Sequence, residues 1–244
     1  MTVLAVIPAR GESKGIVLKN LQPLLGRPML AYAIEAAKAC PHVHTVLVST
    51  DSERIAEVAK QYGAVVPFLR PPELSRDDVT LDPVVYHAVQ QAEDRLRERY
   101  DVAACIQPTC PLLTSATITA VLQHMDRDEL DTAIAVTEDR HLVWTPMPDG
   151  TYYQQERLNR QWLPPTYREA GAVLASRRHV IAPHSRIGGK VGLVLIDRAE
   201  ALDVDDHLDL WQAQLILRGR QSVRETAPVR LVATLERPLP TEEP

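Results

Sequence analysis

Short apolar runs that lack polar alternation constrain the fold of this chain more than any other feature. Residues 3–7 read VLAVI, residues 44–51 read HTVLVSTD, and residues 132–138 read TAIAVTE. A strand that is apolar on both sides is typical of a parallel sheet with both faces covered. Segments with helical spacing separate these runs, so the order of strands and helices predicts an α/β fold with a doubly wound, mostly parallel sheet.

The other segments extend this pattern. We expect helices at 28–39, 52–63, 82–100, 114–127 and 200–220, and further strands at 65–69, at the start of 101–113, at 171–181 and at 190–196. Residues 140–170 have no clear period and are interpreted as an insertion over the sheet or an arm that reaches a partner subunit. We expect residues 221–244 to form a tail that is either an ordered strap or disordered. These patterns predict a single domain over residues 1–220, followed by the tail.

Composition and charge argue against several classes of protein. A chain of 244 residues is long enough for one sizeable α/β domain. Its formal net charge of −5 disfavours nucleic-acid binding, which usually needs a basic surface. Three cysteines are too few for a disulfide scaffold, and no apolar run reaches the length of a membrane span. We therefore expect a cytoplasmic protein with reduced thiols and no membrane partner.

The loop after the first apolar run holds three cations within ten residues. It reads IPARGESKGIVLKN over residues 7–20. Glycine-containing turns present backbone N–H groups to phosphate oxygens, and lysine or arginine side chains add charge. The residues that suit such a site are Arg10, Gly11, Ser13, Lys14, Gly15 and Lys19. The spacing fits neither a Walker A motif nor G-x-G-x-x-G, and an ordinary solvated loop is the alternative.

Two carboxylates alternate just before the last expected helix. In an extended segment Asp203 and Asp205 point to the same side, where they repel each other unless a cation lies between them. Mg²⁺ is commonly held by one or two carboxylates together with substrate phosphates. The alternative is that Asp205, Asp206 and Asp209 simply favour the N-terminus of the helix through its dipole.

Three arginines lie in or beside the segment without a clear period. Arg157, Arg160 and Arg168 could bind a carboxylate, because the guanidinium fork matches its two oxygens. The alternative is that all three are solvated on the surface of an arm.

Several segments together resemble one known family. In order along the chain these are IPARGESKGIVLKN, VSTD, LRPPELSRDD, HAV, IQPTCPLL, NRQWLPPTYREAGAV and LDVDDHLDL. They resemble the motifs of the acylneuraminate cytidylyltransferases, the CMP-sialic acid synthetases. The resemblance covers residues 3 to about 217 and implies a Rossmann-like nucleotidyltransferase fold with a dimerisation arm at about 140–175.

The resemblance implies a reaction and a set of site residues. The family joins CTP to a nine-carbon α-keto sugar acid and forms a CMP-sugar and pyrophosphate. The implied CTP-binding residues are Arg10, Gly11, Ser13, Lys14, Lys19, Asn20 and Arg70, with Arg70 near the cytosine. The implied sugar-acid residues are Gln107, Arg160 and Arg168, and the implied Mg²⁺ ligands are Asp203 and Asp205. A homodimer is implied as well.

The chemistry of these residues agrees with that reaction. The anomeric hydroxyl would attack the α-phosphorus in line, with Mg²⁺ neutralising phosphate charge. Arg10, Lys14 and Lys19 would act as catalytic cations by stabilising the pyrophosphate leaving group. No residue stands out in the sequence as a general base.

Some positions depart from the family pattern. Glu12 and Val17 replace a frequent Gly and Pro in the loop, and Ala170, Leu174 and Trp144 stand where the family has other side chains around the sugar. These departures leave the acceptor open among sialic, legionaminic, pseudaminic and deaminated nonulosonic acids.

Two alternative functions remain at this point. One is a cytidylyltransferase for another acceptor, a phosphonate or 3-deoxy-octulosonate, although the SKG and KN spacing argues against the octulosonate group. The other is a non-catalytic sugar-nucleotide binding protein, which we would expect to lack the aspartate pair or the loop lysines.

Overall fold

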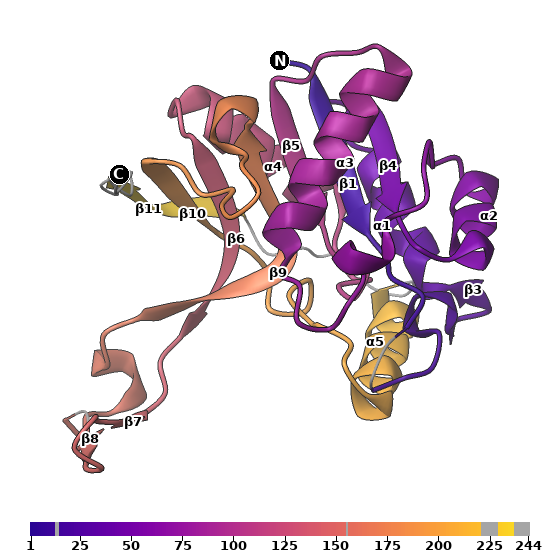
Figure 1. The fold of residues 1–244 in the computed structure, drawn as a ribbon. Helices are drawn as coiled ribbons and strands as arrows, with labels where there is room; N and C mark the ends of the chain where they lie inside the picture. The colour runs from indigo at the N-terminus through magenta and orange to yellow at the C-terminus, as the bar shows by residue number, and fades with distance from the viewer. Residues whose placement is uncertain (13–14, 155, 221–228, 237–244) are drawn as a thin grey trace.

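A computed structural model describes residues 1–12, 15–154, 156–220 and 229–236 and is organised around one seven-stranded sheet (Figure 1). The strand order is β11-β10-β6-β9-β5-β1-β4. The strands are β1 (Val3–Pro8), β4 (Thr45–Ser49), β5 (Val102–Ile106), β6 (Thr132–Asp139), β9 (Thr166–Arg177), β10 (Lys190–Leu195) and β11 (Arg230–Glu236). Only β9 and β11 run antiparallel to their neighbours, so the predicted mostly parallel α/β sheet is confirmed.

Helices cover both faces of the sheet. They are α1 (Met29–Lys38), α2 (Glu53–Gln61), α3 (Leu81–Leu96), α4 (Ser115–Arg127) and α5 (His207–Arg220). The side chains of Ser52 and Thr114 cap α2 and α4 by accepting hydrogen bonds from Ile55 N and Thr117 N. Short pieces complete the fold: β2 (Pro23–Leu24), β3 (Arg27–Pro28), and the 3₁₀ turns Lys19–Leu21, Pro72–Leu74, Arg160–Trp162 and Arg178–Val180.

The first strand shows why its sequence is apolar throughout. Val3, Ala5 and Ile7 pack with α1, α2 and α4 on one face, whereas Leu4 and Val6 pack with α3 on the other. All five side chains are buried, and burying a Val, Leu or Ile side chain contributes about 1.5–3 kcal/mol. A strand with both faces covered therefore needs no polar position.

A long ribbon leaves the sheet and carries a hairpin away from the body of the molecule (Figure 1). It is formed by the end of β6 and the start of β9, which pair from Val136 with Glu169 to Asp139 with Thr166. The hairpin consists of β7 (Trp144–Pro146) and β8 (Tyr152–Gln154). From Ala170 onward β9 is buried, so the projecting arm ends earlier than the predicted boundary at about 175.

Two sequence predictions need correction. The strand expected at 65–69 is wrong, because Val65 forms only an isolated bridge with Leu47 and Pro67 has no N–H for a ladder. Residues 230–236, which we had placed in the tail, form β11 at the edge of the sheet and pair antiparallel with β10. Among the described residues, no helix combines the length and the apolar character needed to cross a bilayer.

Candidate active site

The residues that the sequence singled out gather at the carboxyl ends of the parallel strands. The loop after β1, the loop after β5 and the segment between β10 and α5 all meet at this edge, together with the first half of β9. Open α/β sheets bind ligands at this edge, because the loops that connect strand to helix lie there.

The cationic loop is packed directly against the acidic segment. Ile16 is buried in one apolar cluster with Val204, which lies between the two aspartates. A Cβ added at Gly15 would come closer than 3.0 Å to the backbone oxygen of Asp205, so only glycine fits there. Lys19 then reaches the same residue, with its Nζ 3.0 Å from Asp205 Oδ1. The predicted phosphate loop and the predicted metal ligands are therefore neighbours.

The start of the loop is held by hydrogen bonds and one ion pair. Gly11 N donates to Asp51 Oδ1 at 2.8 Å, and Arg10 Nη1 lies 2.5 Å from Asp77 Oδ1. Asn20 is buried and donates from Nδ2 to the Arg10 carbonyl at 3.1 Å. Asn20 therefore fixes the backbone from which the Arg10 side chain extends.

Arg70 is a buried cation at the end of β4. Its Nε donates to Ser49 Oγ at 3.1 Å, and its Nη2 donates to the Ser49 carbonyl oxygen. Burial lowers the pKa of Arg70 to about 10, with the positive charge of Arg10 adding to the effect and the carboxylate of Asp51 opposing it. Arg70 is still charged at neutral pH, and a charged group buried at this cost indicates a place for an anion or a polar ring.

These side chains line a cavity of about 220 Å³. Its polar lining includes Arg10, Glu12, Lys19, Asn20, Arg70, Arg76, Asp77, Gln107 and Thr109. Four of the predicted CTP-binding residues thus share one cavity, and Gly11 directly follows one of them, Arg10, in the chain. The predicted residues Ser13 and Lys14 lie outside the described part of the chain.

A second, larger cavity of about 630 Å³ adjoins the first. Gln107 lines both cavities. The larger one is also lined by Thr137, Arg168, Glu169, Ala170, Gly171, Arg198, Asp203, Asp205 and Asp209. Gly171 has a φ of +67° and leaves room for Gln107, whose Nε2 would lie 3.0 Å from a Cβ at that position.

The four acidic residues of the segment divide into two roles. Asp209 Oδ2 accepts from the N–H groups of Asp205 and Asp206 at 2.9 and 3.0 Å, and Asp206 Oδ1 accepts from Leu208 N and Asp209 N. The helix-terminus interpretation therefore holds for Asp206 and Asp209. The carboxylates of Asp203 and Asp205 take no part in this capping.

The electrostatics of Asp203 suit a cation site. Although its side chain is open to solvent on the cavity side, the surrounding protein partly desolvates the carboxyl and raises its pKa. The neighbouring negative charge of Asp205 adds to this rise, whereas Thr109 and Lys19 oppose it. No group of three or more His, Cys, Asp and Glu residues suited to a metal occurs in the described ranges. Two carboxylates alone fit Mg²⁺, which commonly takes its other ligands from water and substrate phosphates.

Comparison with known proteins agrees with this geometry. A family model described as Cytidylyltransferase matches residues 4–215. The chain belongs to the cytidylyltransferase family. It is therefore a nucleotidyltransferase.

Relatives within the family confirm the resemblance to acylneuraminate cytidylyltransferases. The chain is 29% identical over 231 residues to an N-acylneuraminate cytidylyltransferase of Escherichia coli, covering 91% of this chain and 54% of that longer protein. It is 28% identical over 235 residues to a pseudaminic acid cytidylyltransferase of Campylobacter jejuni, covering 89% of this chain and 97% of the other. A structure of CMP:2-keto-3-deoxy-manno-octonic acid synthetase with CTP matches with a TM-score of 0.63 over 91% of this chain and 100% of the other. Its 18% sequence identity supports the shared fold alone.

Other residues of this cytidylyltransferase place the acidic segment, and the sequence did not reveal them. Glu200 is buried and accepts hydrogen bonds from Thr114 N and Thr114 Oγ1 at 3.0 and 3.2 Å. Val204 N donates to the Thr109 carbonyl at 2.8 Å. These contacts join positions about ninety residues apart, and nothing in the local sequence pairs those positions with each other. The ion pair of Asp77 with Arg10 also joins two positions that are distant in the sequence.

The predicted sugar-acid residues are only partly brought together. Gln107 and Arg168 line the larger cavity. Arg160 and Arg157 lie exposed on the arm and line neither of the two cavities within this chain. The role predicted for Arg160 stays a prediction.

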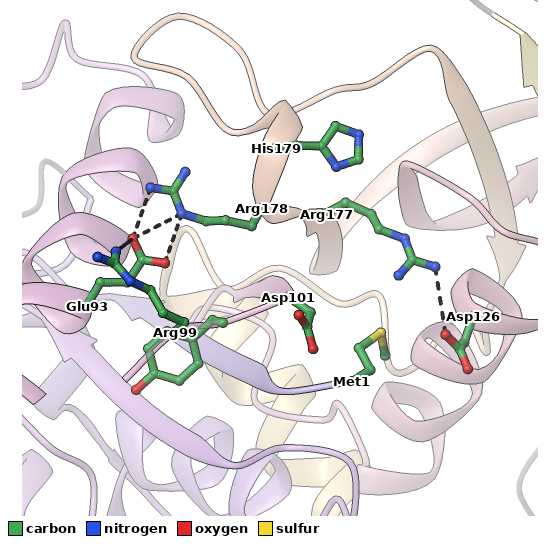
Figure 2. Close-up of a pocket in the computed structure, with 9 residues that line it drawn as sticks. Met1, Glu93, Arg99, Asp101, Asp126, Arg177, Arg178 and His179 are labelled. Atoms are coloured by element: carbon green, nitrogen blue, oxygen red, sulfur yellow. Dashed lines mark hydrogen bonds and ion pairs between the residues drawn. The ribbon is translucent and has the colours of Figure 1, made fainter. Parts of the chain in front are cut away.

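The cytidylyltransferase has a further cavity, of about 800 Å³, at the opposite edge of the sheet (Figure 2). Five of its charged groups are paired with one another. Glu93 lies 3.0 Å from Arg178 and 3.3 Å from Arg99, and Arg177 faces Asp126 at 3.7 Å. Of the predicted site residues that the structure describes, none lines this cavity. Its size alone therefore does not make it a substrate site.

Proposed function

We propose that this cytidylyltransferase transfers CMP from CTP to the anomeric hydroxyl of a nonulosonic acid and releases pyrophosphate in a Mg²⁺-dependent reaction. The observation that carries this proposal is the pair of adjoining cavities at the carboxyl edge. The smaller is lined by Arg10, Lys19 and Arg70, and the larger by the aspartate pair. Two substrates held there would meet at Gln107, which lines both cavities.

The smaller cavity suits the nucleotide. Arg10 and Lys19 offer positive charge to the phosphates, and Arg70 at the buried end suits the cytosine ring. Arg10 pairs with Asp77 and Lys19 pairs with Asp205. When CTP binds, each cation would therefore exchange its carboxylate partner for a phosphate. Removing one such stabilising group typically costs about 100- to 1,000-fold in rate.

The larger cavity suits the acceptor. Its volume of about 630 Å³ lies in the range of small-molecule sites, about 300–1,000 Å³. Gln107 and Thr137 offer hydrogen bonds to hydroxyl or amide groups, and Arg168 offers a partner for a carboxylate. The names of the relatives, an N-acylneuraminate and a pseudaminic acid cytidylyltransferase, support an acceptor of this class.

In the proposed reaction the anomeric hydroxyl oxygen forms a bond to the α-phosphorus. The bond from that phosphorus to the bridging oxygen breaks, pyrophosphate leaves with the electron pair, and the hydroxyl proton passes to solvent. Arg10 and Lys19 stabilise the charge that builds on the leaving group. Mg²⁺ held by Asp203 and Asp205 would neutralise phosphate charge and orient the substrates.

Pyrophosphate release with CTP and Mg²⁺ tests the proposal across a panel of acids. The panel contains N-acetylneuraminate, deaminated neuraminate, legionaminate, pseudaminate, 3-deoxy-octulosonate and 2-aminoethylphosphonate. We expect strong turnover of one nonulosonic acid. Turnover of only the phosphonate or the octulosonate would move the acceptor to another class. CTP binding without turnover of any acid would favour a non-catalytic binding protein.

A matched pair of variants tests the aspartate pair. Asp205→Asn removes a charge that faces the larger cavity, and we expect kcat to fall about 100-fold or more. Asp206→Asn changes the neighbouring carboxylate, whose capping role asparagine can take over, and should leave turnover near the wild-type value. Equal activity of both variants would contradict the metal assignment.

We further propose that the chain forms a homodimer through the arm. Trp144, Tyr152 and Trp162 are 58%, 65% and 71% exposed, and exposed apolar clusters of this kind mark interaction surfaces. Arg160 on the same arm could then reach an acceptor bound by the partner subunit. Light scattering should give a dimer mass for the wild type and for Leu215→Glu on α5, and a monomer mass for Trp162→Glu. A monomeric wild type would refute the dimer.

A further inference from the structure

Arg198 is an arginine of the larger cavity that the sequence did not single out. It follows β10, two residues beyond Ile196, whose N–H donates to the Val136 carbonyl at 3.0 Å. Its side chain is exposed and lines the cavity together with Arg168. The two arginines come from opposite sides of β6, because the sheet order is β10-β6-β9.

Backbone spacing explains how the two side chains can approach each other. Neighbouring strands lie about 4.8 Å apart, so β10 and β9 are separated by about 10 Å across the end of β6. An arginine side chain is long enough to cover half of that distance from either side. The pKa of Asp139, at the end of β6, lies below its usual range, mainly because of the hydrogen bond with His141. The positive charges of Arg168 and Arg198 add to this lowering. Both arginines are therefore directed to the same region.

The charges that line the cavity are unevenly distributed. Asp203, Asp205 and Asp209 supply negative charge on the side of α5, whereas Arg168 and Arg198 supply positive charge that outweighs the one acid beside Arg168, Glu169. In an α-keto sugar acid the carboxylate and the reacting hydroxyl are bonded to the same anomeric carbon, so both groups enter the cavity together. The aspartates repel the carboxylate and the arginines attract it, so the carboxylate turns to the arginines and the hydroxyl is left to face the α-phosphate.

Neither arginine has a committed partner among the residues that the structure describes. No carboxylate in those ranges lies within ion-pair distance of Arg168 or Arg198. Asp139, the acid between them, already accepts from His141. Two uncommitted guanidinium groups in one cavity match a planar carboxylate, which accepts paired hydrogen bonds from arginine.

We propose that Arg198 forms with Arg168 a two-arginine clamp for the carboxylate of the acceptor, and so orients the anomeric carbon, which carries both the carboxylate and the reacting hydroxyl, toward the α-phosphate. This inference rests on the proposed function, because it assigns a residue to the acceptor of that reaction. It extends the acceptor site from β9 to the segment after β10.

Steady-state kinetics of Arg198→Gln, Arg198→Lys and Arg168→Gln test the clamp. We expect Arg198→Gln to raise the KM for the acid about 10- to 100-fold, the effect of losing a charge-assisted hydrogen bond, while the KM for CTP stays within about twofold. Arg198→Lys should recover part of the loss, since it restores charge without the fork. Arg218→Gln, an exposed arginine of α5, is the matched control and should change neither KM.

An acceptor analogue separates recognition from support of the fold. A carboxamide analogue should inhibit the wild type more weakly than the acid does, whereas Arg198→Gln should bind amide and acid almost equally. The double variant Arg168→Gln/Arg198→Gln should lose less than the product of the single losses, because both side chains serve one carboxylate.

Three results would overturn the inference. An unchanged KM for the acid in Arg198→Gln would remove Arg198 from the acceptor site, while the proposed function would stand on wild-type turnover. Parallel rises in both KM values together with a lower melting temperature would make Arg198 structural. If the wild type releases no pyrophosphate with any acid of the panel, the proposed function fails and the clamp fails with it.

Discussion

Replacement of Gly15 by alanine should separate the cationic loop from the acidic segment. In the structure the added Cβ would lie closer than 3.0 Å to the backbone oxygen of Asp205, and a backbone atom cannot move aside as the end of a side chain can. The buried neighbours Ile16 and Val204 hold the two segments in this arrangement. The loop must therefore retreat, and Lys19 leaves its 3.0 Å contact with Asp205.

The size of this movement predicts the size of the effect. Ordinary contact begins at 3.4 Å, so the segments must separate by about 1 Å, and a misplacement of that size can cost about 100-fold in rate. The stability should change much less. Alanine reduces the freedom of the unfolded chain, which favours folding by about 0.4–1 kcal/mol and offsets part of the local clash.

The assay combines pyrophosphate release with thermal unfolding. We expect Gly15→Ala to lose about 100-fold in kcat/KM while its Tm shifts by no more than about 4 °C, the change that corresponds to about 1 kcal/mol in a chain of this size. Gly219→Ala is the matched control, because a Cβ on this glycine of α5 meets open space. Wild-type kinetics in Gly15→Ala would refute the reasoning, since the close packing of the two segments would then have no catalytic importance.

Two further predictions concern Arg70 and the nearby His87. Arg70→Met should weaken CTP binding about tenfold or more in calorimetry. The free energy of unfolding should change by less than about 2 kcal/mol, because the loss of the hydrogen bonds to Ser49 is offset by removal of a buried charge. A large stability loss with unchanged CTP affinity would make Arg70 structural. Burial, with the charge of Arg70 adding to it, lowers the pKa of His87, whose ring lies edge-on to Phe68 at 5.0 Å. As the pH falls through about 6.5, His87 takes up a proton in the unfolded chain before it does so in the folded chain, so the free energy of unfolding should decrease below that pH in urea titrations. His87→Gln should make this decrease smaller. The same dependence of stability on pH in both proteins would contradict the assignment.

Most of the fold could be predicted from the sequence, because apolar runs and helix caps are local signals. The helices expected at 52–63 and 114–127 are present, and the first residues of those ranges, Ser52 and Thr114, cap them. The errors occur where pairing depends on distant partners. β11 at residues 230–236 exists because β10 offers an open edge some forty residues earlier, and residues 65–69 fail as a strand because Pro67 interrupts the ladder.

The site could be predicted by residue type but not by arrangement. Motif residues such as Lys19 and Asp205 lie 186 positions apart, and only the fold brings them to 3.0 Å. Arg198 gave no signal, since a single arginine in a loop is common on protein surfaces. Asp77 lies in the segment LRPPELSRDD, but nothing there marked it as the partner of Arg10. Their proposed importance comes from what they face in the folded chain.

The acidic segment shows why chemistry and geometry are encoded in different residues. Its two carboxylates supply the charge, but their place is determined by contacts that carry no charge into either cavity. Val204 packs its side chain against Ile16 and donates its N–H to the Thr109 carbonyl at 2.8 Å. Glu200 ties the same segment to the start of α4 through Thr114. These contacts reach the loops after β1 and β5, so a change at any of them would move both aspartates without altering a predicted ligand-binding residue.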